Sequence, residues 1–189
     1  AFVPGLRAQL STLTEKFGFD PRGHDGKALV HALTTLPHDL LIAFGADDLE
    51  RVATAMMALI DRPRPRLLLV RSPLDRHLYA FVWLPRDALS TTVRLGIQDL
   101  LERAAAGPMI DWTLAVEGGL AVLRFVIDIP DDAATPDEQA LDAAVKAMVR
   151  GWPGAVEAAL IAHEEPRRAA AIAARYAEAF PLSYRSAHG

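Results

Sequence analysis

The feature that most constrains the fold is the succession of patterns between Asp39 and Val116. Read in order, the stretch predicts a strand, a helix, two strands, a second helix and a further strand. This order builds a small sheet with helices packed on it. Modules of this kind often bind a regulator or another domain, so the pattern constrains the architecture more than it constrains the chemistry.

Two apolar runs are predicted to form the central strands of this sheet. The run over residues 39–44 is short and nearly continuous, as in a strand that helices cover. The run over residues 77–84 is rich in aromatic residues. Tyr79, Phe81 and Trp83 alternate along it and so share one strand face. We expect these three side chains to pack in the core or in an interface.

Apolar residues at helical spacing predict helices over residues 46–60 and 90–106. Ser90 is expected to cap the second helix, because its hydroxyl oxygen can accept a hydrogen bond from a free backbone N–H group of the first turn. Gly107 and the following proline end this helix.

Three strands complete the predicted sheet. Residues 67–71 follow a connector whose prolines lack N–H donors, which suits an edge strand. Residues 110–117 alternate, with Trp112, Leu114 and Val116 facing one way, and after a Gly-Gly turn residues 120–129 return antiparallel beside them. The prediction is therefore an α+β fold with the ferredoxin-like, ACT-like order βαββαβ and an added fifth antiparallel strand.

Helical segments are predicted on both sides of this α+β domain, which we place at residues 39–130. Residues 1–38 form an N-terminal helical segment, with helices over residues 6–17 and 26–36. Residues 131–189 form a C-terminal helical extension that is rich in alanine.

The C-terminal extension carries its own start and stop signals. Thr135 begins a capping-box pattern, in which Pro136 takes the first helical position. Pro153 with Gly154, and later Pro166, are expected to break the helical run.

Composition excludes several classes of function. The absence of cysteine excludes disulfides, thiolate catalysis and zinc sites built on cysteine. A net charge of −4 gives no electrostatic footprint for nucleic acid or an anionic membrane. No apolar run approaches the ~18 residues of a membrane span. We expect a cytoplasmic chain that binds neither nucleic acid nor membrane and that is part of a longer protein.

Motifs for catalysis, cofactor binding or metal binding are not found, and no residue is predicted for any of these roles. The glycines before residue 27 follow no strand and lack the spacing of a nucleotide-binding loop. His163 and Glu164 do not complete a zinc-protease motif, because Arg167 stands where the second histidine belongs. The only basic cluster, made of Arg62, Arg64, Arg66 and Arg71, is interpreted as a connector or an interdomain salt-bridge surface.

Several stretches resemble the large bacterial NAD-specific glutamate dehydrogenases. The most specific part combines the strand end at residues 82–87 with the C-terminal pattern over residues 180–184. The stretches that carry the resemblance are Asp25–Leu29, Leu36–Leu40, Arg66–Arg71, Tyr79–Asp87, Thr91–Arg94, Trp152, Arg175–Tyr176, Ala179–Pro181 and Tyr184.

The resemblance implies a non-catalytic, ACT-like region that precedes the catalytic domain of such an enzyme. The parent reaction would be oxidative deamination of glutamate to 2-oxoglutarate with NAD, while these 189 residues would hold no cofactor. The implied partners are the catalytic domain of the same chain and further copies in a homo-oligomer.

A small regulatory ligand is a further expectation by analogy with ACT domains. The turn at Gly45, Ala46 and Asp47 is its predicted place, because backbone N–H groups at a helix start can bind the carboxylate of an amino acid. Two alternatives stay open. The chain could be a structural interaction module without a ligand, or an enzyme of unknown class.

Overall fold

The structure is a computed structural model that describes residues 15, 20, 23, 40, 44–60, 62–72, 76–117, 119–130, 132–176 and 179. The predicted helices over residues 6–17 and 26–36 lie outside the described residues, except for Glu15, which is helical. The elements, in chain order, are α4 (Ala46–Ile60), β1 (Arg66–Arg71), β2 (His77–Pro85), the 3-10 turn η1 (Arg86–Ala88), α5 (Thr91–Ala105), β3 (Met109–Glu117), β4 (Leu120–Asp128), α6 (Glu138–Ile161) and α7 (Pro166–Arg175).

The four described strands form one antiparallel sheet in the order β1-β2-β4-β3. The central strands β2 and β4 pair along their whole length, from His77 opposite Asp128 to Pro85 opposite Leu120. Strands β1 and β3 are the two edges. Taken in the order β4-α6-β1-β2-α5-β3, the elements follow the βαββαβ sequence of the ferredoxin-like fold, so the observed ββαββα order is a circular permutation of it.

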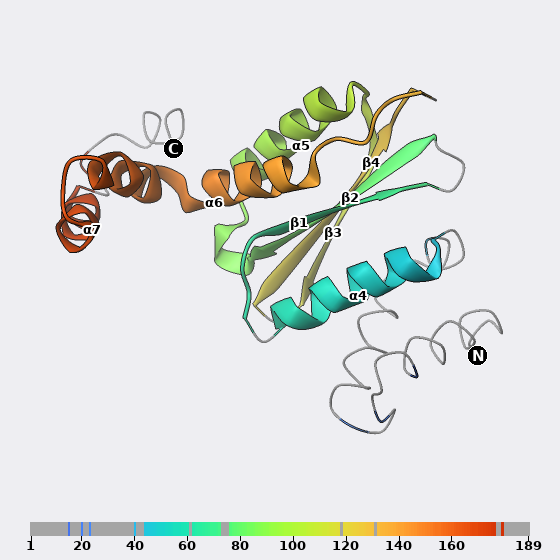
Figure 1. The fold of residues 1–189 in the computed structure, drawn as a ribbon, viewed down its shortest axis with the longest axis horizontal. Helices are drawn as coiled ribbons and strands as arrows, with labels where there is room; N and C mark the ends of the chain where they lie inside the picture. The colour runs from blue at the N-terminus through green and yellow to red at the C-terminus, as the bar shows by residue number, and fades with distance from the viewer. Residues whose placement is uncertain are drawn as a thin grey trace.

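Helices cover both faces of the sheet (Figure 1). Helix α4 lies on one face, and α5 with the first half of α6 lies on the other. The α4 face includes Phe81 and Trp83 of β2, which are buried and stacked with ring centroids 6.0 Å apart. The prediction that the β2 aromatics pack in the core is therefore confirmed. Leu123 and Phe125 of β4 are buried on the opposite face, beneath α5 and α6.

The predicted α+β class is confirmed, but two strand assignments are wrong. The apolar run over residues 39–44 is not a strand where the structure describes it. Leu40 is helical, and the Phe44 backbone N–H donates to the Leu40 carbonyl at 2.9 Å, which is a helical spacing. Both side chains are buried in the α4-face core. A short buried run suits a helix end as well as a strand, so its apolar character could not decide between them.

The second correction concerns the strand that was predicted as an addition to the sheet. Residues 120–128 pair antiparallel with β3, as predicted, but β4 also pairs with β2 and so occupies a central position. Among the described residues the sheet has four strands, and β4 takes the place that residues 39–44 were expected to fill.

The passage from α5 to β3 is tight. The Ser90 side chain accepts from the Val93 N–H, as predicted, and Ala106 takes a left-handed conformation with φ 51° at the end of the helix. A Cβ atom on Gly107 would lie 1.8 Å from the backbone oxygen of Asp128. Glycine is therefore required where the chain passes the end of β4.

The first half of α6 folds back onto the sheet. Its cap is Asp137, which accepts from the N–H groups of Gln139 and Ala140, so the prediction that the cap is Thr135 is wrong. The helix bends where Gly151 has φ 61°, two residues before the break predicted at Pro153. Beyond the bend, α6 leads away from the sheet toward α7 (Figure 1). Among the described helices, none is both long and apolar enough to cross a membrane.

Candidate functional site

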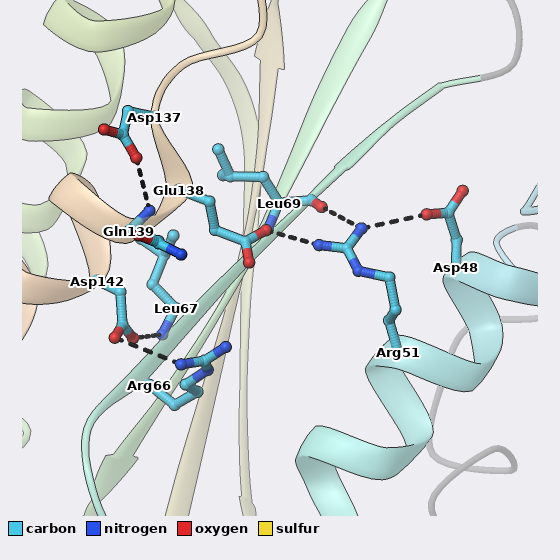
Figure 2. Close-up of polar contacts among 9 residues, drawn as sticks. All are labelled: Asp48, Arg51, Arg66, Leu67, Leu69, Asp137, Glu138, Gln139 and Asp142. Carbon is cyan, nitrogen blue, oxygen red and sulfur yellow. Dashed lines mark hydrogen bonds and ion pairs between the residues drawn. The ribbon is translucent and has the colours of Figure 1, made fainter.

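A polar groove runs along the outer edge of β1, between α4 and α6. It has a volume of about 810 Å³, and residues from all three elements line it. Its cations include Arg51, Arg66 and Lys146, and its anions include Glu138. Figure 2 shows that Arg51 of α4 and Glu138 of α6 point toward each other across β1.

Two carboxylates of α6 bind the free edge of β1. Glu138 Oε2 accepts from the Leu69 backbone N–H at 2.8 Å, and Asp142 Oδ1 accepts from the Leu67 N–H at 2.7 Å (Figure 2). Four residues along a helix rise about 6 Å, and two residues along a strand span about 6.8 Å. One helix face can therefore present two acceptors to alternate N–H groups of one strand.

Arg51 joins α4 to the same edge. Its guanidinium donates to Glu138 Oε2 at 2.8 Å, and also to the Leu69 carbonyl and to Asp48 Oδ1 at 3.4 Å each. The contact with Glu138 links two helices that lie on opposite faces of the sheet. Both the N–H and the carbonyl of Leu69 are thus bound by side chains.

Asp142 is a buried carboxylate that pairs with two cations of the groove, Arg66 and Lys146. Its side chain is 10% exposed, and its Oδ2 lies 2.5 Å from Lys146 Nζ and 3.5 Å from an Arg66 guanidinium nitrogen. A buried carboxylate is costly unless it is paired and hydrogen-bonded, and Asp142 meets both conditions. Its contacts indicate a structural role.

The predicted basic cluster contributes to this arrangement. Arg66 pairs with Asp142, and Arg71 donates to the Ala133 carbonyl at 2.6 Å, so two of its four members hold α6 and the loop before it. Arg62 and Arg64 are exposed on the connector that enters β1. The interpretation of the cluster as a salt-bridge surface agrees with the contacts of Arg66.

The predicted ligand turn lies at the start of α4. Gly45, Ala46 and Asp47 are all exposed there, and the Gly45 carbonyl accepts from the Leu49 N–H at 3.1 Å. Asp47 reaches the groove, where it is one of the lining residues. Ligand binding at this turn stays a prediction. Within the described part of the chain, no cluster of three candidate ligands could hold a metal ion.

Sequence reasoning missed Glu138 and Asp142. Both lie on α6 beside Leu141 and Val145, which are buried against the sheet. The available signal was a pair of acidic residues four positions apart that flanks a buried apolar position. This signal shows that the carboxylates face inward, but it does not name β1 as their partner.

Comparison with known proteins places two parts of the chain in one family. Residues 66–153 match the family model described as "Glutamate dehydrogenase, ACT2 domain", and residues 3–62 match "Glutamate dehydrogenase, helical motif 1". The first match includes the whole sheet, α5 and the start of α6. It confirms the ACT-like architecture that was predicted from the sequence.

Curated relatives carry the name NAD-specific glutamate dehydrogenase. Those from Pseudomonas aeruginosa and Halomonas elongata are each 29% identical over 185 residues, which is 97% of this chain. The protein from Mycobacterium tuberculosis is 29% identical over 113 residues, or 59% of the chain. The chain spans only 11%, 12% and 7% of the length of these relatives. No solved structure matches the chain.

Proposed function

This chain belongs to the family of NAD-specific glutamate dehydrogenases, as the part with helical motif 1 and the ACT2 domain, and on that premise we propose that it is a non-catalytic assembly and regulatory region. The single observation that carries the proposal is that charged side chains in and beside the groove along β1 bind the protein's own backbone and helices. Glu138 and Asp142 accept from β1, and Arg51 bridges α4 to α6.

The proposal assigns chemistry to another part of the same polypeptide. The parent protein would deaminate glutamate to 2-oxoglutarate with NAD in the cytoplasm, on a catalytic domain that this region supports. The division into an N-terminal segment at residues 1–38, a domain at 39–130 and an extension at 131–189 belongs to the same proposal. In that division, the part of α6 beyond Gly151 and α7 form the connection that leads away from the sheet.

The first test is enzymatic. The purified 189-residue chain is incubated with glutamate and NAD, and NADH formation is followed by absorbance at about 340 nm. We expect no turnover by the chain alone and normal turnover by the full-length parent. Glutamate-dependent NAD reduction by the isolated chain would overturn the proposal.

The second test addresses assembly in the full-length parent. Exchanging both Glu138 and Asp142 for alanine loosens α6 from β1 and should change the oligomeric state or its stability in sedimentation experiments. The KM for glutamate should stay near the unmodified value, because neither residue is assigned to substrate binding. A variant with unchanged assembly and a strongly raised KM would contradict a supporting role.

An amino-acid effector is the second candidate function, and the groove of about 810 Å³ is the observation that favours it. A groove lined by both cations and carboxylates suits a zwitterionic ligand. Calorimetric titration of the chain with a panel of amino acids tests this candidate. Heat that disappears in Arg51→Met but persists in Arg103→Met, a control at an exposed α5 position, would support it.

A further inference from the structure

Within the part of the chain that the structure describes, β3 is an edge strand without a partner on its outer side, and it carries a row of exposed apolar side chains. Ile110, Trp112, Leu114 and Val116 are 54%, 39%, 43% and 48% exposed. The register places Trp112, Leu114 and Val116 opposite Phe125, Leu123 and Ala121 of β4, so these three share the face that carries α5. Large exposed apolar side chains grouped on one strand are typical of an interaction surface.

The strand carries little of the protection that edge strands usually have. Soluble proteins block open edges with lysine, proline or covering side chains. Residues 109–117 contain neither lysine nor proline, and the charged residues among them are Asp111 and Glu117. A bulge between Met109 and Asp111 affects only the start of the strand. The nine-residue edge is therefore available for pairing along most of its length.

The residue pattern of β3 fits a second copy of itself. An antiparallel two-fold pairing keeps the apolar face continuous only if one residue lies opposite its own copy. Centred on Thr113, such pairing overlaps all nine residues, puts Trp112 opposite Leu114 twice and puts Asp111 opposite Ala115. Centred on Leu114, it would set Asp111 opposite Glu117, and two acidic residues at opposed positions destabilise a sheet.

We infer that β3 is a homotypic interface, on which a second copy of this chain pairs antiparallel about a two-fold axis at Thr113. The two sheets then form one continuous eight-stranded antiparallel sheet. Trp112 and Leu114 of both copies form its shared apolar centre, and the Arg94 guanidinium, 4.5 Å from the Trp112 ring centroid, flanks it. The inference deepens the assembly role proposed above and names its partner.

Site-directed crosslinking tests the axis directly, because the chain contains no cysteine. Directly opposed residues of an antiparallel pair have Cα atoms about 4.5–5.5 Å apart, which a disulfide can bridge. Thr113→Cys should therefore give a covalent dimer under mild oxidation. Ala115→Cys is the matched control, since Ala115 is also exposed and on the same face but would lie about 13 Å from its copy. Equal crosslinking of both variants, or of neither, would overturn the inference.

Sedimentation velocity provides a second, independent measurement. Leu114→Lys puts a charge into the shared apolar centre and should weaken dimerisation at least tenfold. Leu95→Lys is the control, because Leu95 is similarly exposed, at 45%, but lies on α5. Circular dichroism checks that both variants are folded. An unmodified chain that stays monomeric to high concentration, or a Leu114→Lys dimer as tight as the original, contradicts the inference. These readouts report pairing and leave the enzymatic test of the proposed function independent.

Discussion

The two edges of the sheet are treated in opposite ways. At β1, alternate N–H groups are bound by Glu138 and Asp142, and Arg51 reaches the Leu69 carbonyl. At β3, residues 110–116 are all exposed and include four large apolar side chains. Strand β1 has only six residues and follows two prolines, whereas β3 has nine residues and no proline.

The difference teaches how an antiparallel sheet can direct where it associates. An unpaired edge offers backbone hydrogen bonds to any neighbouring strand. At β1, two side-chain carboxylates block such pairing, because each accepts a hydrogen bond from an N–H group that a neighbouring strand would need. In the assembly proposed above, association is thereby confined to β3, so that the sheet extends in one direction only.

The largest expected effect comes from removing the protection of β1. Replacing both Glu138 and Asp142 by alanine leaves the N–H groups of Leu67 and Leu69 without these acceptors. Because each unsatisfied buried donor costs about 1–3 kcal/mol, we expect the free energy of unfolding to fall by about 3–4 kcal/mol. Urea denaturation followed by circular dichroism measures this loss.

The same double variant, made together with Leu114→Lys, tests whether β1 associates with other copies once its N–H groups lose their carboxylate acceptors. We expect concentration-dependent association in sedimentation experiments, because the β1 edge becomes available while β3 is blocked. Asp99→Ala, which removes an exposed carboxylate of α5, is the control. It should change neither the free energy of unfolding nor the association. A double variant as stable as the original chain would refute the protective role of the carboxylates.

The second prediction concerns Gly107, which fixes where the chain enters β3. In Gly107→Ala, the new methyl group meets the Asp128 carbonyl at 1.8 Å, and only a shift of the backbone can relieve the clash. We expect a loss of about 3 kcal/mol in the free energy of unfolding, together with weaker dimerisation. In Gly45→Ala the added atom has open space, so thermal denaturation should show a change within about 0.5 kcal/mol.

A smaller effect separates charge from hydrogen bonding at β1. Glu138→Gln keeps an oxygen that can accept from Leu69 but loses the ionic contact with Arg51. We expect a loss of about 0.5–1 kcal/mol, since partly exposed ion pairs contribute little. Added salt should reduce the difference between the two proteins, because the lost contact is screened. A difference that does not change with salt would show that charge is not the cause.

The smallest effect concerns the flank of β3. Arg94→Met removes the cation beside Trp112 but retains an apolar side chain, and we expect a loss of about 0.5 kcal/mol, as for an exposed cation–π contact. Denaturation followed by tryptophan fluorescence measures it. Arg103→Met on the same helix should leave stability unchanged, and an equal loss in both variants would argue against the ring contact.

Local signals predicted the parts of the fold that depend on neighbouring residues. The Ser90 cap, the β3–β4 pairing and the shared face of Trp112, Leu114 and Val116 all follow from spacing along the chain. The run at residues 39–44 was misassigned because a short apolar segment is buried in either a helix or a strand. The sequence could not show whether the apolar face of β3 is covered, since that depends on which strands α5 packs against.

The candidate site was less predictable, because its contacts join distant parts of the chain. Glu138 and Leu69 are 69 residues apart, and Asp142 and Leu67 are 75 residues apart. The pattern at residues 135–138 suggested that Glu138 would turn back to its own helix start. Asp137 caps the helix instead, and Glu138 is free to reach the strand. The partner of Glu138 was therefore set by tertiary contacts, which the local sequence pattern does not contain.

The bend at Gly151 has a mechanical consequence. The helical part from Glu138 to Arg150 carries both carboxylates that bind β1, while the rest of α6 and α7 lead away from the sheet. A movement of α7 that tilted this part of α6 would strain both carboxylate contacts with β1 at once. Rotation of the backbone at Gly151 would leave both contacts intact. Backbone rotation at Gly151 would therefore decide how much of a movement of α7 reaches the sheet.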